Sequence, residues 1–301
     1  MPTRQGSIRI FRLFGIDVYL HWSWFLIVLF DIQSRSQMYN SYAWNALETL
    51  SLFGIVLMHE FGHALACRQV GGKANQIVLW PLGGVAYVAP PQRPGAMLWS
   101  IAAGPLVNVV LVPVLFGLSI FARQAGWEDR SPNFSTYLAA VQVTNLIILI
   151  FNLLPIYPLD GGQIFRSLLW FAVGRANSLM VASALGFVGV AGMALFAYFS
   201  QQVWFWVLAA FAGFNCWAGY KQAQQLLRLE KSPRRAEFHC PVCQESPPIG
   251  EFWGCSQCQK TFDTFLSQGF CPHCNAEYHV TSCPYCFNGR PMAEWRSGGG
   301  K

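Results

Sequence analysis

Long apolar runs separated by short polar segments make up most of the chain before Tyr220. About 20 consecutive apolar residues cross the hydrocarbon core of a bilayer, and six runs approach that length. They predict transmembrane helices near 16–32, 46–66, 97–121, 137–155, 178–199 and 202–220. The expected fold is therefore an all-α polytopic membrane protein over this part of the chain.

The segment between the second and third predicted spans has a different pattern. Residues 77–80 (Ile-Val-Leu-Trp) and 85–88 (Val-Ala-Tyr-Val) are β-type runs that flank Pro-Leu-Gly-Gly at 81–84. They predict a short membrane-associated β element. Non-helical backbone at membrane depth needs protein or water to satisfy its hydrogen bonds. An ordinary cytoplasmic loop is the alternative.

The low content of charged residues supports a membrane protein, and the positions of Lys and Arg predict its orientation. Only 11% of the residues are charged, whereas soluble chains carry about 25%. With the N-terminus inside, only Arg35, Arg123 and Arg130 of the membrane part lie in outer loops. The positive-inside rule then predicts a multi-pass cell-membrane protein with both termini cytoplasmic. The net charge of +6 follows from this placement, which argues against nucleic acid as a partner.

The second predicted span carries a chemical motif, His59-Glu60-Phe61-Gly62-His63. Two histidines four residues apart share one face of a helix and can bind one metal ion. Glu60 is then placed to act as general base on a water at that metal. Ionisable residues are costly inside a membrane and indicate function. The alternative is a polar cluster between helices with no metal.

A catalytic zinc usually has three protein ligands and one open position. Asp160 is the one acidic residue ahead of the tail that is expected on the inner side, just after an apolar span. Prolines 155 and 158 and glycines 161 and 162 break the helix there. Asp160 is therefore expected to turn back as the third ligand, although an isolated Asp-Gly is usually a turn.

These motifs resemble a known family. The His59–His63 motif, the segment from Asn152 through Pro155 to Asp160, and Ala-Gly-Pro-Leu-Val-Asn at 103–108 are similar to the site-2 proteases, which are intramembrane zinc metalloproteases. Residues 14–25 resemble the branch that includes the sporulation-factor processing proteases. The resemblance covers roughly residues 8–220.

The resemblance implies zinc on His59, His63 and Asp160, with Glu60 as catalytic base and acid. It also places Asn152 near the active centre, in contact with substrate or the developing oxyanion. A helix-packing amide is the alternative for Asn152.

Two further positions match the family. His21 matches a position in the first span, although an interfacial histidine beside two tryptophans is the alternative. The loop around Gly83 and Gly84 resembles a strand element that offers its edge to an unwound substrate.

Cysteines dominate the tail. Cys67 and Cys216 are isolated near span ends and are interpreted as apolar residues. The other eight form four Cys-x-x-Cys pairs: Cys240/Cys243, Cys255/Cys258, Cys271/Cys274 and Cys283/Cys286. Such pairs indicate structural zinc rather than disulfides, because the tail is expected in the reducing cytoplasm.

The simplest arrangement is two successive zinc ribbons, with one zinc on the first two pairs and a second zinc on the last two. A cross-braced pairing of alternate motifs is the alternative. His239, His273 and His279 are possible replacements for a thiolate. With the catalytic site, the chain is expected to hold one catalytic and two structural zinc ions.

The expected domains are a metalloprotease domain (1–222), a basic linker (223–237), a double zinc-ribbon domain (238–295) and a flexible tail (296–301). Several relatives in this branch carry a nucleotide-sensing tail instead, which puts that mode of regulation in doubt here. The ribbons lack a concentrated basic stripe, so a protein partner is expected rather than nucleic acid.

The predicted function is a zinc-dependent intramembrane endopeptidase acting in the lipid bilayer. By family resemblance, its substrate is a single-span, membrane-anchored regulatory protein. A non-proteolytic scaffold or zinc-responsive regulator is the alternative, although the intact Glu60 argues against it. A metal transporter is disfavoured because the third, fifth and sixth predicted spans carry almost no ionisable residues.

Overall fold

The computed structural model describes residues 6–26, 28, 38–80, 83–127 and 131–295. The chain divides into two units, Met1–Tyr220 (the membrane unit) and Lys221–Lys301 (the tail unit). Each unit is described by itself below.

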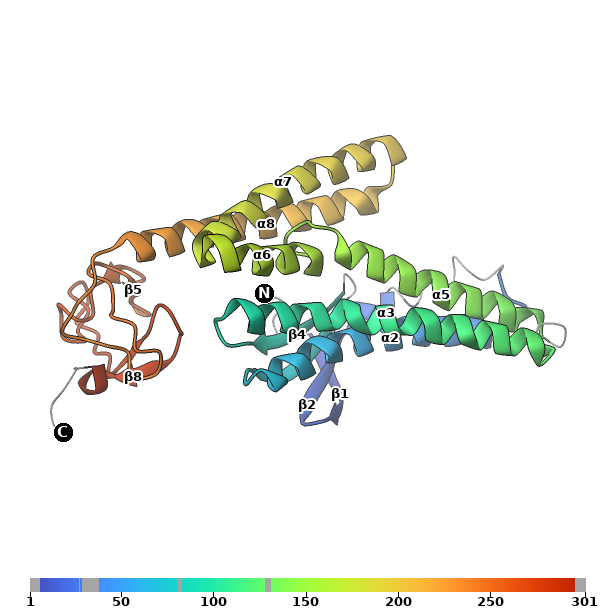
Figure 1. Cartoon of the computed structure of the whole chain (residues 1–301), viewed down its shortest axis with the longest axis horizontal. Helices are drawn as coiled ribbons and strands as arrows, with labels where there is room; N and C mark the ends of the chain where they lie inside the picture. The colour runs from blue at the N-terminus through green and yellow to red at the C-terminus, as the bar shows by residue number, and fades with distance from the viewer. Residues whose placement is uncertain (1–5, 27, 29–37, 81–82, 128–130, 296–301) are drawn as a thin grey trace. The chain divides into compact units, whose positions relative to one another are not determined.

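The membrane unit combines one small sheet with long helices (Figure 1). Its elements in chain order are β1 (Ser7–Leu13), β2 (Ile16–His21), α2 (Tyr42–Gln69), β3 (Lys73–Trp80), β4 (Gly83–Ala89), α3 (Pro94–Gln124), α5 (Pro132–Leu153), α6 (Asp160–Val173), α7 (Arg175–Ser200) and α8 (Val203–Lys231). The last of these continues into the tail unit.

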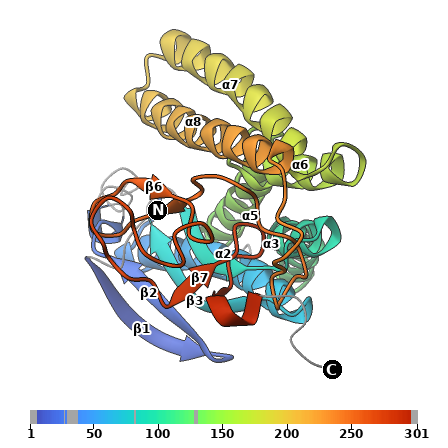
Figure 2. The ribbon, with the colours of Figure 1, turned by 90° about the vertical axis from the view of Figure 1, so that its left-hand side faces the viewer.

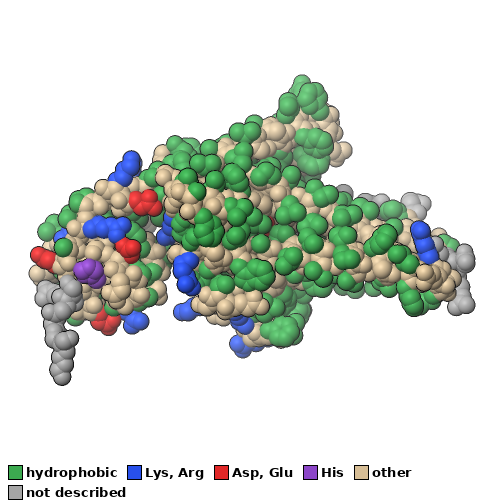
Figure 3. Space-filling model, in the orientation of Figure 1, with side chains coloured by type: hydrophobic (Ala, Val, Ile, Leu, Met, Phe, Trp, Pro, Cys, Tyr) green, Lys and Arg blue, Asp and Glu red, His purple; other side chains and the backbone are tan. Residues whose placement is uncertain are grey.

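Five helices among the described residues are long and apolar enough to cross a membrane: α2, α3, α5, α7 and α8. Their outward surfaces are apolar (Figure 3), and Phe116, Ile150, Val188 and Phe214 are each more than 60% exposed. Side chains of this kind suit contact with lipid rather than water. The predicted spans from the second to the sixth therefore each correspond to a helix.

The predicted first span, 16–32, is wrong at its beginning. Ile16–His21 form strand β2, in which Ile16 and Val18 are fully buried while Asp17 between them is not. That alternation has the period of a strand, although the apolar run as a whole is as long as a span. Residues 24–26 are helical, and most of the remainder of the predicted span lies outside the described residues.

The β element is larger than the predicted hairpin. β3 and β4 pair antiparallel as expected, and β2 adds to β3 in parallel, giving the order β1-β2-β3-β4. One face of the sheet buries Ile77 and Leu79 against Phe61 and Ala64 of α2. β4 is an edge strand that also lies along α2.

The chain breaks between α5 and α6 where the sequence predicted it. α5 ends at Leu153, and Asp160 is the first residue of α6. A side chain at Gly161 would meet the Leu153 carbonyl at 2.3 Å, and one at Gly162 would meet the Tyr157 backbone nitrogen at 2.4 Å. Glycine therefore permits α6 to fold back closely onto the segment before it. The α6 helix itself was not anticipated from the sequence.

Helices α7 and α8 form a hairpin with a short turn (Figures 1 and 2). α8 extends to Lys231, so the first part of the expected basic linker is helical.

After the end of α8, the tail unit has little regular structure beyond two short hairpins. β5 (Trp253–Gly254) pairs with β6 (Thr261–Phe262), and β7 (Val280–Ser282) pairs with β8 (Gly289–Pro291). A 3-10 helix, η1 (Met292–Trp295), follows. The core is small: Trp295 is fully buried against Phe265. Domains with so small a core generally need disulfides or metal for stability.

Candidate active site and metal centres

Three side chains from two distant segments converge in the membrane unit. His59 and His63 lie one turn apart on α2, and Asp160 begins α6. Asp160 Oδ2 lies 3.0 Å from His59 Nε2 and 3.3 Å from His63 Nε2, and the two Nε2 atoms are 3.1 Å apart. Both imidazoles are buried. These are the three residues that the sequence analysis selected as zinc ligands.

The size of this triangle suits a zinc ion. Ligand atoms at about 2.0–2.1 Å in a tetrahedral shell are separated from one another by about 3.3 Å. The three observed separations lie between 3.0 and 3.3 Å. Two imidazoles and one carboxylate are also a donor set that catalytic zinc sites use, with a fourth position left for water or substrate.

Each histidine is oriented through its other ring nitrogen. His59 Nδ1–H donates to the side-chain oxygen of Asn108 at 2.6 Å, and His63 Nδ1–H donates to the carbonyl of Ser100 at 2.9 Å. These bonds leave both Nε2 lone pairs directed at the triangle, as in many metal sites. The Asn108 amide in turn donates to Asn145 Oδ1 at 2.8 Å, which fixes its own orientation.

These supporting residues were missed by the sequence analysis, in which Asn108 figured only as the end of a family motif. The sequence did contain a signal for two of them. Asn108 and Asn145 are buried amides within apolar spans, and a buried polar group requires a partner.

Glu60 lies next to the triangle but points to the sheet. Its Oε2 accepts a hydrogen bond from the backbone N–H of Ala86 on β4 at 2.8 Å. The carboxylate occupies the space above Gly84, where a Cβ would come within 2.2 Å of Glu60 Cγ. The β element thus supplies both the donor and the room that hold this carboxylate.

Gly104 on α3 has a similar role for the histidines. A Cβ at this position would lie 2.3 Å from His63 Nε2 and 2.9 Å from His59 Nε2. The absence of a side chain lets α3 pass directly beside the two rings.

Asn152 and His21 lie apart from the triangle's hydrogen bonds. Asn152 is half-buried in the last turn of α5, and its side chain makes no hydrogen bond to the described residues. His21 is buried at the end of β2, where it stacks on Trp80 with ring centroids 4.1 Å apart. Its Nδ1 contacts the hydroxyl of Ser23.

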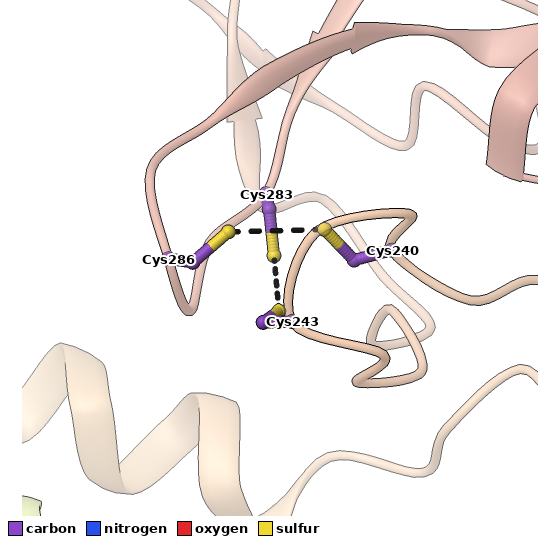
Figure 4. Close-up of side chains that lie close together, drawn as sticks. All are labelled: Cys240, Cys243, Cys283 and Cys286. Atoms are coloured by element: carbon purple, nitrogen blue, oxygen red, sulfur yellow. Dashed lines mark hydrogen bonds between the residues drawn. The ribbon is translucent and has the colours of Figure 1, made fainter. Parts of the chain in front are cut away.

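The eight tail cysteines form two clusters, but with neither of the pairings considered from the sequence. Cys240, Cys243, Cys283 and Cys286 come together (Figure 4), and Cys255, Cys258, Cys271 and Cys274 form the second cluster. The first pair therefore joins the last pair, and the two middle pairs join each other. The expected successive arrangement and the cross-braced alternative are both wrong.

The nested pairing follows from how the tail unit closes. The backbone N–H of His239 donates to the carbonyl of Trp295 at 2.8 Å, which brings the segment before Cys240 next to the segment after Cys286. Cys240 and Cys286 are thereby neighbours, with sulfurs 3.7 Å apart. The middle pairs form their own cluster within the long loop that this closure creates.

Both clusters have the dimensions of a tetrathiolate zinc site. Zn–S bonds of about 2.3 Å place sulfurs about 3.8 Å apart in a tetrahedron. The observed separations are 3.7 Å for Cys240–Cys286 and for Cys243–Cys283. They are 3.5 Å for Cys255–Cys274 and 3.7 Å for Cys258–Cys271.

In the second cluster, Cys255 accepts hydrogen bonds that favour its thiolate form. The backbone N–H of Cys258 and the hydroxyl of Tyr278 both donate to Cys255 Sγ, and these hydrogen bonds lower the pKa of this thiol. Metal ligation requires the deprotonated sulfur. None of His239, His273 and His279 belongs to either cluster.

Known proteins share the membrane unit. Residues 48–129 and 124–196 match the family described as peptidase family M50. The chain is 33% identical over 224 residues to the zinc metalloprotease MJ0392 of Methanocaldococcus jannaschii, covering 74% of this chain and 62% of that protein. It is 31% identical over 179 residues to stage IV sporulation protein FB of Bacillus subtilis, covering 58% of each.

A solved structure agrees with the sequence matches. The site-2 protease from Methanocaldococcus jannaschii superposes with a TM-score of 0.52 and 30% identity, covering 71% of this chain and 95% of that one. Against the curated relatives reported above, the chain spans about three fifths of their length. The resemblance noted in the sequence is confirmed: this chain is a multi-pass membrane protein that belongs to peptidase family M50, the site-2 proteases.

Proposed function

We propose that this chain is a zinc-dependent intramembrane endopeptidase. The observation that carries the proposal is the convergence of His59, His63 and Asp160 within 3.0–3.3 Å, beside the carboxylate of Glu60. The related protein MJ0392 is named a zinc metalloprotease, which supports the choice of metal and of reaction.

The chemistry is peptide-bond hydrolysis. His59, His63 and Asp160 would hold a zinc ion, which would supply Lewis acidity and lower the pKa of a nearby water. Glu60 takes the proton from the attacking water and delivers it to the departing amine nitrogen. The Nδ1 bonds of the two histidines keep their Nε2 atoms directed at the centre throughout.

Asn152 is proposed as a substrate contact. It is the penultimate residue of α5, just before the break that leads to Asp160, and its donors and acceptor are unused by the described residues. It is therefore able to bond with a substrate carbonyl or the oxyanion that develops from it.

The substrate class proposed is a single-span membrane protein that carries a regulatory domain. A helical substrate hides its carbonyls in hydrogen bonds, so its span must unwind before attack. β4 is a sheet edge beside Glu60, and such an edge can pair with an extended segment.

The proposal also covers the orientation of the chain in the membrane and the role of the tail unit. The distribution of Lys and Arg supports cytoplasmic termini. The two cysteine clusters support two structural zinc ions, which would bring the total to three. The zinc-ribbon surface is proposed to bind a protein partner, because it combines acidic and basic residues without a basic stripe.

The test is cleavage of a panel of single-span membrane proteins by purified full-length chain in liposomes. Wild type is expected to give product, and Glu60→Gln is expected to lose activity by at least about 10²-fold. Asn177→Gln, at an exposed position on α7, is the matched control. Equal product from wild type and Glu60→Gln would refute the protease, and no product from either across a broad panel would favour the scaffold.

A further inference from the structure

Two arginines that the proteolytic site does not use share one tryptophan ring. Arg166 and Trp170 lie one turn apart on α6, and Arg175 is the first residue of α7. The guanidinium carbons of Arg166 and Arg175 lie 6.0 Å and 5.8 Å from the centroid of Trp170. Each cation is attracted by the ring, and the pair concentrates positive charge at one place.

No acidic side chain among the described residues neutralises Arg166. Of the acidic residues described in the membrane unit, Asp17 pairs with arginines of β1, Glu48 accepts from Tyr39, Glu60 accepts from Ala86, and Asp160 lies at the histidines. The Nε of Arg166 is shielded from solvent and has no hydrogen-bond partner in the described part of the chain. Arg166 as a residue is partly exposed, so an anion from outside the protein can neutralise its charge.

The cluster lies where spans meet the membrane boundary. The side chains of Trp99 in α3 and Gln69 at the end of α2 are hydrogen-bonded, so α2 ends where α3 begins. Phe171 of α6 lies beside Gly95 in the first turn of α3. α6 therefore sits at this end of the bundle, the level at which tryptophan and arginine are enriched.

The same short helix also exposes an apolar surface. Leu168, Phe171 and Val173 are 53%, 62% and 42% exposed. At a membrane boundary such side chains face acyl chains, while the arginines face headgroups. A ligand suited to both features carries a phosphate and a hydrocarbon tail.

We propose that Arg166, Trp170 and Arg175 form a binding site for the phosphate of an anionic phospholipid. Guanidinium groups bind phosphate through parallel N–H donors, and the phosphate neutralises the charge of Arg166, which no acidic side chain among the described residues does. The acyl chains then lie over exposed apolar side chains of α6, of which Val173 shares one face of the helix with Arg166 and Trp170. Free phosphate has no such chains and would not use that surface.

The test counts lipids bound to the full-length chain by native mass spectrometry from detergent. Phosphatidylglycerol and phosphatidylcholine with identical acyl chains are titrated separately. Wild type is expected to bind the first phosphatidylglycerol several-fold more tightly than phosphatidylcholine. Arg166→Gln and Arg175→Gln are each expected to weaken that binding by about fivefold, and the control Arg123→Gln, near the other end of α3, is expected to leave it unchanged.

Equal binding of the two lipids would overturn the proposal, as would wild-type affinity in both glutamine variants. Excess inorganic phosphate is expected to compete weakly, and complete displacement at matched concentration would identify free phosphate as the ligand instead. Thermal unfolding checks that the variants are folded. If the glutamine variants are unfolded, Arg166→Lys and Arg175→Lys replace them. These variants keep the positive charge but lose the planar guanidinium group. Unaltered lipid affinity in them would refute recognition by the guanidinium groups. None of these measurements depends on proteolysis, so the lipid-binding proposal and the proposed protease function are tested separately.

Discussion

The carboxylate of Glu60 accepts a hydrogen bond from the backbone N–H of Ala86, which belongs to an edge strand. Helix α2 and strand β4 are thus joined at the group proposed to move protons. The room for this contact comes from Gly84, since any Cβ there would overlap the Glu60 side chain.

Gly84→Ala is expected to displace Glu60 and to lower kcat by about 10²-fold or more, because proton transfer depends on the position of the base. Zinc content should stay at the wild-type value, since no ligand is touched. Cleavage in liposomes and metal analysis of the same preparation measure the two effects. Gly54→Ala, on α2 with no atom within 4 Å of its added Cβ, is the control. Wild-type activity in Gly84→Ala would show that the observed position of Glu60 is irrelevant to turnover.

Asn108→Ala is expected to weaken zinc binding at the active site by about 10–100-fold, because His59 loses the acceptor that orients its ring. The measurement is a competition titration with a chelator, which reports metal affinity without cleavage. Asn215→Ala serves for comparison, because that amide bonds only within α8. Unchanged zinc affinity in Asn108→Ala would mean that the hydrogen bond does not tune the site.

Gly104→Ala is expected to remove zinc from the active site, because its methyl group would overlap the ring of His63. Gly117→Ala lies on the same helix, where nothing comes within 4 Å of the added Cβ, and should bind zinc normally. Metal analysis after dialysis compares the two. Full zinc occupancy in Gly104→Ala would require α3 to shift away from α2, against the close packing of Gly62 on Ala103.

The active-site triangle was predictable because each part has a local signature. Helical periodicity places His59 and His63 on one face, and the prolines and glycines around Asp160 mark the break that returns it to the bundle. The partners Asn108 and Ser100 lie on another helix, and the register between α2 and α3 is set by packing that no local pattern encodes. Sequence reasoning therefore finds the proposed ligands more readily than the residues that hold them.

Two predictions were wrong, the beginning of the first span and the pairing of the cysteine motifs. Ile16–His21 alternate like a strand, but the pattern is brief and continues into an apolar run. The strand pairs with β1, directly before it, and with β3, which lies more than 50 residues later. The spacing of the cysteine pairs likewise carries no information about which loop encloses the other. Closure of the tail unit through His239 and Trp295 decides it.

The nested cysteine pairing predicts a specific zinc stoichiometry. The double variant Cys240→Ser with Cys286→Ser damages one cluster, whereas Cys240→Ser with Cys258→Ser damages both. The first is expected to lose one structural zinc per chain and the second to lose two, because a tetrathiolate site binds far more weakly without one of its thiolates. Metal analysis of the full-length chain counts the ions, and Cys67→Ser, outside both clusters, controls for the loss of a thiol. Successive ribbons would reverse the result, since Cys240 and Cys258 would then share one zinc while Cys240 and Cys286 would belong to different ones.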